Sequence, residues 1–266
     1  MVPGKDGIAG IPINTYQAAR QVYNPSNIYL LIGDQSDKVL NEIDLRLLDP
    51  SSSQDEEMIY RLALITAFQY EEGVSDEVAS DASRKRVDWK YALHLPVLYQ
   101  GIPAQALSDF RASLLSSPRA MREYGHLLEI LHQMGFFQQK PEGSVDPCTT
   151  LRTVCQISRL YRLYYGIKAA LSMIGSMDPD WLRQHMSSHW FSHYKTGELG
   201  LPVWNDLETM TRQALRIGKD IQFLLNTLRE QKLIRLIYQP EIQAISRLME
   251  EQFVISGEQI QWKIPG

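Results

Sequence analysis

The chain has 266 residues, 44% of them hydrophobic, and a formal net charge of −4, so it can bury one large core or two smaller ones. It contains no run of about 20 apolar residues, which a membrane-spanning helix requires, and its first residues lack the apolar stretch of a signal peptide. Cys148 and Cys155 would lie two turns apart on a helix, beyond disulfide reach. We therefore expect a cytoplasmic protein without a membrane partner.

The first half of the chain has mainly helical hydrophobic spacing. Residues 1–33 are rich in Gly, Pro and Asn and indicate an arm with one short helix near residues 15–22. Capping residues and breaks then delimit several further helices. These are expected at residues 36–48, at 55–72 with Gly73 as C-cap, from Ser75 or Asp76 to about Arg86, at 104–115, and from Pro118 to about Gly135.

Residues 140–144 read Lys-Pro-Glu-Gly-Ser and predict a boundary between domains 1–139 and 140–266. Helical spacing continues beyond the boundary, and the last residues alternate around a glycine, which predicts a terminal hairpin. The expected elements are helices from about residue 149 to 175, at 179–185 with Asp178 as N-cap, from 205 or 206 to 217 with a continuation over 219–230, and at 240–253, then a hairpin over 254–262. The predicted fold class is mainly α, a helical bundle with a helix-turn-helix-like region and a short C-terminal β-hairpin.

Positive charge is concentrated in one segment of this acidic chain. Residues 84–122 carry 7 Lys or Arg against 2 Asp or Glu, whereas residues 1–83 carry 5 against 14. Such a segment is typical of a phosphate-binding surface, although a solvated helix face explains the charge equally well. The candidate DNA contacts are Arg84, Lys85, Arg86, Lys90, Arg111, Arg119 and Arg122.

The helix expected at residues 104–115 is the best candidate to enter a groove of DNA. Its apolar spacing predicts that Gln105, Ser108 and Arg111 face outward, and arginine bound to guanine is the commonest specific contact. The alternative is that Arg111 pairs with Asp109 or with an acidic residue of the first 83.

Several short strings are similar to the N-terminal domain of one protein family. They read RLAL at 61–64, QY at 69–70, EGVSD at 72–76, RVDWKYAL at 86–93 and LSDFR at 107–111. Together they resemble bacterial insertion-sequence transposases of the DDE type with an InsH-like N-terminal domain. The resemblance implies binding to the terminal inverted repeats of an insertion sequence, next to the bacterial nucleoid.

The resemblance also implies strand cleavage and joining by a two-metal site, with Mg²⁺ held by three acidic residues. Asp146 occupies the first of these positions, but Pro147, Cys148 and Thr149 replace the expected Ser-Thr that follows it. The second and third acidic residues lie beyond the matched region, and the sequence ends at Gly266 without them. We expect no metal site and no cofactor in this chain, and no catalysis by this chain alone.

Three functions follow from these observations. The first is a transposase-derived protein that binds double-stranded DNA. The second is a regulatory or partner subunit of a split transposase, which binds another transposase chain or a copy of itself. The third is a helical protein-interaction module without a DNA role. Histidines at 185, 189 and 193 have helical spacing for zinc, but Ser187-Ser188 favours a helix break there, so no metal is predicted.

Overall fold

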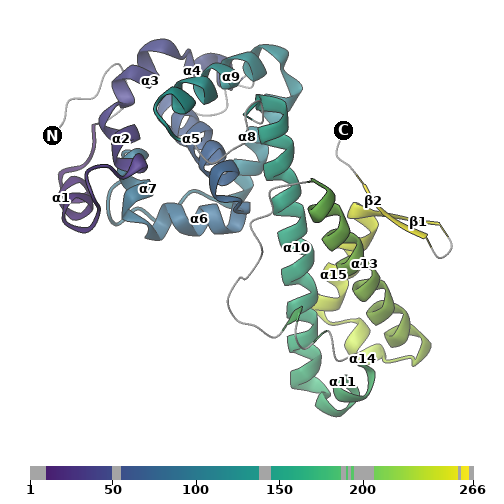
Figure 1. The fold of residues 1–266 in the computed structure, drawn as a ribbon. Helices are drawn as coiled ribbons and strands as arrows, with labels where there is room; N and C mark the ends of the chain where they lie inside the picture. The colour runs from purple at the N-terminus through teal and green to yellow at the C-terminus, as the bar shows by residue number, and fades with distance from the viewer. Residues whose placement is uncertain are drawn as a thin grey trace. The chain divides into compact units, whose positions relative to one another are not determined.

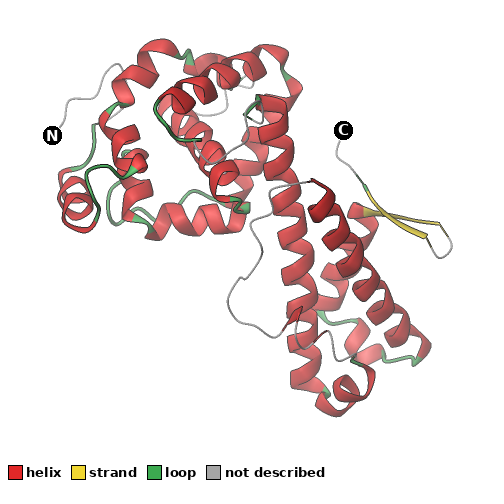
Figure 2. Cartoon of the chain, in the orientation of Figure 1, coloured by secondary structure: helices red, strands yellow, loops and turns green. Residues whose placement is uncertain are grey.

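The structure is a computed structural model, and it describes residues 10–49, 55–137, 145–186, 190, 193–194, 207–256 and 259–263. The fold is mainly helical, with one two-stranded sheet among these residues (Figures 1 and 2). None of the described helices combines the length and the apolar composition needed to cross a membrane. The predicted fold class is therefore confirmed.

The chain forms two compact units, residues 1–155 and 156–266. Their boundary falls within the long helix α10 (Pro147–Met177), so the first turns of α10 belong to the first unit. The predicted boundary at residues 140–144 lies outside the described residues.

The helices of the first unit surround a large apolar core, and a smaller separate cluster contains Ile11, Ala19, Leu30 and Tyr91. Phe68, Trp89 and Phe136 lie at the centre of the large core, with the Phe68 ring 5.2 Å from Trp89 and 5.3 Å from Phe136. Besides the start of α10, this unit contains α1 (Ile13–Val22), α2 (Ile28–Asp34), α3 (Ser36–Glu42), α4 (Leu45–Leu48), α5 (Glu56–Glu72), α6 (Asp76–Lys85), α7 (Val87–Ala92), α8 (Ala104–Ser116) and α9 (Pro118–Gln133).

Local capping explains most of the boundaries in this unit. Gly73 ends α5 with a positive φ of 67°, a conformation that glycine adopts without steric cost. The Ser75 side chain then accepts the N–H of Val78 and begins α6, and the Ser117 side chain accepts the N–H of Ala120 and begins α9. The predicted caps Gly73 and Ser75 and the predicted helix start at Pro118 are confirmed, whereas the Ser117 cap was not predicted.

Two predictions near the N-terminus are wrong. Residues 28–34 form α2 rather than part of an arm, because the Asn27 side chain caps the helix and Leu30 and Ile32 are buried. The helix expected over residues 36–48 is interrupted after Glu42, where Ile43 is extended and the Asp44 side chain caps α4. In each case a short polar side chain stabilises a helix start that apolar spacing does not reveal.

The second unit has its own apolar core. The helix predicted to continue past Gly218 is continuous. A Cβ at Gly218 would lie 2.7 Å from the Phe253 ring, so the lack of a side chain at this position permits a close contact with the hairpin. Asp178 caps its helix as predicted. Besides the rest of α10, this unit contains α11 (Pro179–His185), α13 (Leu207–Glu230), α14 (Ile234–Ile237), α15 (Pro240–Gln252), β1 (Phe253–Ser256) and β2 (Gln259–Trp262).

Candidate nucleic-acid interface

The basic segment begins at the last turn of α6, where Arg84 and Lys85 point into solvent. Their side chains are 51% and 62% exposed, and both pair with Asp81 on the same helix. Hydrogen bonds from Lys85 and then Arg84 hold the pKa of Asp81 below its usual value. Exposed pairs of this kind contribute little to stability, so both cations remain accessible to a phosphate at small cost.

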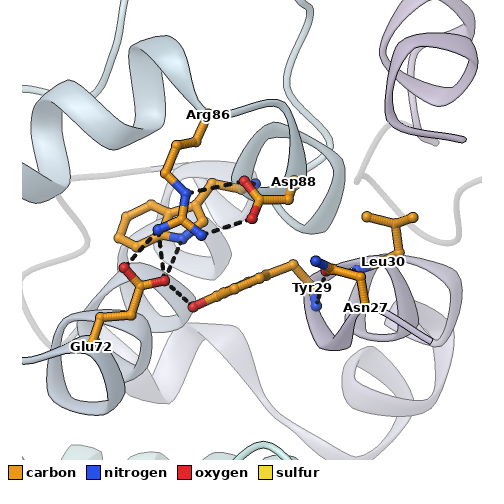
Figure 3. A network of polar contacts seen from close by, with 7 residues as sticks. Asn27, Tyr29, Leu30, Glu72, Arg86 and Asp88 are labelled. Atoms are coloured by element: carbon orange, nitrogen blue, oxygen red, sulfur yellow. Dashed lines mark hydrogen bonds and ion pairs between the residues drawn. The ribbon is translucent and has the colours of Figure 1, made fainter. Parts of the chain in front are cut away.

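Arg86 is held by an internal network that joins α2, α5 and α7 (Figure 3). Its guanidinium donates to both carboxylate oxygens of Glu72, at 2.7 and 2.6 Å, and to both oxygens of Asp88, at 3.1 and 2.7 Å. Tyr29 and Trp89 donate to the same Glu72 oxygen. Two carboxylates thus hold the guanidinium on two sides, so Arg86 is less available to a phosphate than its place in the basic segment predicts, and its role as a DNA contact stays a prediction.

Lys90 is also turned inward and is 3% exposed. Its ammonium donates to the backbone carbonyls of Val97 and Tyr99, the latter at 3.3 Å, and so fixes the loop that follows α7. Desolvation by burial, with a smaller effect of Arg84, lowers the pKa of Lys90. In this structure the Lys90 ammonium holds a loop and is not presented to a phosphate, so its role as a DNA contact stays a prediction without structural support.

Arg111, the one cation of the predicted groove helix α8, is 2% exposed. It donates to Asp76 at 2.7 Å and to Gln69 at 3.2 Å, while Gln69 donates to Asp76 at 2.9 Å. This triad ties α8 to α5 and α6. The outward orientation predicted for Arg111 is wrong, and the alternative, pairing with an acidic residue of the first 83, is what the structure shows.

The remaining predicted positions of α8 lie at the surface. Gln105 is exposed and donates to Asp109 at 2.7 Å, and Ser108 is half-buried. Without Arg111, the outward face of α8 offers polar groups and one carboxylate but no cation. Its capacity to bind phosphate is therefore small.

Arg119 and Arg122 lie on the first two turns of α9, and both are exposed. Their side chains make no hydrogen bond or ion pair with any described residue. The opposite face of α9 is buried in the core through Ala120 and Tyr124. Cations at this end of a helix oppose the helix dipole, so helix stability does not account for them.

Asp146, the position that the resemblance assigns to catalysis, acts at the start of α10. Its carboxylate accepts the backbone N–H groups of Cys148 at 3.0 Å and Thr149 at 3.1 Å, as an N-cap does. Burial opposes its ionisation, but hydrogen bonds from the Thr149 hydroxyl and from these backbone groups outweigh burial and lower its pKa. Nowhere in the described part of the chain do three His, Cys, Asp or Glu side chains cluster as metal ligands.

The sequence did not predict which acidic residues pair with the inward-pointing arginines. Glu72 and Asp76 stand in the EGVSD string at 72–76, and Asp88 follows Arg86 by two residues. The excess of acidic residues before residue 84 was the available signal, because it supplies counter-charges for the basic segment that follows.

Comparisons with models of protein families, with curated proteins and with solved structures found no match. The resemblance to transposases therefore stays a prediction.

Proposed function

We propose that this chain is a transposase-derived protein that binds double-stranded DNA at the terminal inverted repeats of an insertion sequence, without catalysing strand transfer alone. The single observation that carries the proposal is the pair Arg119 and Arg122, exposed and without side-chain partners among the described residues. The first turns of a helix also direct backbone N–H groups and the positive end of its dipole outward, which suits a phosphate. Arg84 and Lys85 are the secondary contacts.

Base contacts in this proposal come from the outward face of α8. Gln105 and Ser108 lie on this face. The helices α8 and α9 are consecutive and are joined through Ser117. Glutamine recognises adenine through paired hydrogen bonds, and serine bonds to any base. In the unbound protein the Gln105 amide is occupied by Asp109, so base contact requires that this exposed hydrogen bond opens.

The test measures affinity for a mixed-sequence duplex as a function of salt concentration. Each neutralised phosphate contributes about 0.9 to the slope of log affinity against log salt, so the double variant Arg119→Ala, Arg122→Ala should lower the slope by about 1.8. The matched control is Arg183→Ala with Arg212→Ala, which removes the same charge from arginines that are 69% and 68% exposed. This control should leave the slope unchanged.

Equal slopes for the wild type and the Arg119, Arg122 double variant would show that this surface does not contact DNA phosphates. Enrichment of one sequence from a random duplex pool, lost in Gln105→Ala, would support recognition of a specific repeat. Failure of the wild-type chain to bind any duplex at low salt would reject the proposed function.

A further inference from the structure

The strand β1 has one edge without a neighbouring strand. The sheet consists of β1 and β2 alone among the described residues, with Ile255 opposite Ile260 and Val254 opposite Gln261. The hairpin projects beyond the helices of its unit (Figure 1). The strand β1 reads Phe-Val-Ile-Ser. It contains no charged residue and no proline, which are the residues that usually protect such an edge from pairing.

Apolar side chains are exposed on both faces of β1. Val254 and Ile255 are each 46% exposed, although they lie on opposite faces of the strand. Ile255 shares its face with Phe253 and Ile260, which pack on Gly218 of α13, but Ile255 itself extends past this contact. A further strand beside β1 would pair the open backbone groups of this edge and bury more of Ile255.

A groove of about 490 Å³ borders β1, and Phe253 and Ile255 form part of its lining. Leu225 and Met249 form its buried apolar floor. On its rim, α13 contributes Arg229 and α15 contributes Glu250, both exposed, and neither side chain forms an ion pair with another described residue. One surface therefore carries an open strand edge, an apolar floor and one charge of each sign.

We propose that β1 and this groove are a self-association site, at which a second copy of the chain pairs its β1 antiparallel to the first. A two-fold interface brings the same patch together from both copies, so it must be complementary to itself. This patch carries the charges for such an interface, because Arg229 and Glu250 line the same groove and a two-fold axis can bring each of them to the opposite charge of the second copy. A strand from another protein could pair with the open edge of β1, but it would not in general carry charges that complement both Arg229 and Glu250.

The side-chain alternation restricts the possible registers to those with the two-fold axis through a residue of β1, and the proposed axis passes through Val254, the middle of Phe253, Val254 and Ile255. Directly opposite residues of an antiparallel pair lie on the same face, so the two apolar inner faces join when the axis passes through Val254. Phe253 of one copy then lies opposite Ile255 of the other. The two hairpins form a four-stranded sheet in the order β2–β1–β1–β2, and its centre is apolar.

Analytical ultracentrifugation of the full chain tests the association through charge reversal. Wild type should form a dimer whose fraction rises with protein concentration. Arg229→Glu alone and Glu250→Arg alone each place like charges opposite each other twice per dimer, and each should weaken the dimer by about tenfold or more. The double reversal should restore wild-type association. A wild type that is monomeric at every concentration, or a dimer insensitive to both single reversals, overturns the proposal.

Cysteine crosslinking tests the register independently. The two-fold axis places residue 254 of both copies directly opposite, at a Cα distance of roughly 4.5–5.5 Å, which a disulfide can span. Val254→Cys should give a covalent dimer under mild oxidation. Gln261→Cys, exposed on the same face of β2, is the matched control and should give none beyond the background from Cys148 and Cys155 in wild type. Equal crosslinking of the two variants overturns the register. Neither measurement uses DNA, so a failure of self-association can be distinguished from a failure of the proposed DNA binding.

Discussion

The basic residues of the first unit divide into two groups with opposite surroundings. Arg86, Lys90 and Arg111 point inward and are held by carboxylates, amides or backbone carbonyls. Arg119 and Arg122, on the first turns of α9, point outward without partners in the described part of the chain. Net charge per segment cannot separate the groups, because both contribute equally to it. The difference teaches that burial decides which cations are candidate contacts, because a cation held by buried partners is not available to a phosphate, whereas one in an exposed pair still is.

This division assigns a structural role to much of the string that resembles transposases. Tyr29, Glu72, Arg86 and Asp88 form one network, and Arg111 with Asp76 forms another. Both networks connect helices that are distant in sequence. We infer that these strings specify the packing of the unit, whereas α9 carries the surface available to a partner.

The largest expected effect comes from Arg111→Met, which removes the buried guanidinium and leaves Asp76 buried without its counter-charge. Breaking a buried pair in this way costs about 3–5 kcal/mol of unfolding free energy. Arg122→Met is the control on the neighbouring helix and should change stability by no more than about 0.5 kcal/mol. Urea unfolding followed by circular dichroism measures both, and similar midpoints for the two variants would abolish the contrast between inward and outward arginines.

A smaller effect is expected for Asp146→Ala, which removes the cap of α10. Capping side chains contribute about 0.5–2 kcal/mol. Because the folded pKa is lowered, this contribution is present above the ordinary aspartate value of about 3.9 and is lost as pH falls through the folded pKa. Unfolding at a series of pH values should show the gap between wild type and variant closing in acid.

Activity provides the second measurement on Asp146. The purified chain should neither nick nor join DNA with Mg²⁺ present, since Asp146 is committed to a helix start. Specific cleavage that disappears in Asp146→Ala would contradict the structural role. Cleavage that persists in the variant would indicate a contaminating nuclease.

The smallest effect on stability is expected for Arg84→Ala combined with Lys85→Ala. Both side chains pair only at the surface with Asp81, so the unfolding free energy should change by less than about 0.5 kcal/mol in each case. The same double variant should lower the slope of log DNA affinity against log salt concentration by at most about 1.8, the value for two phosphate contacts. A large loss of stability would place these residues with the inward group.

Local sequence determined most of the element boundaries. Gly73, Ser75 and Asp178 were predicted as caps and act as caps, because a cap depends on residues within one helical turn. The terminal hairpin was predicted for the same reason, since alternation around one glycine is a local pattern. The helical fold class followed from the apolar spacing.

Tertiary structure alone decided which charges are free. Arg111 meets Asp76 across 35 residues of sequence, and Arg86 meets Glu72 across 14. Likewise, Gly218 of α13 is in close contact with Phe253, which lies far along the chain. No local pattern contains these pairings, because they depend on how helices approach one another when the core forms. The exposure of Arg119 and Arg122, on which the proposed function depends, is also a result of that packing.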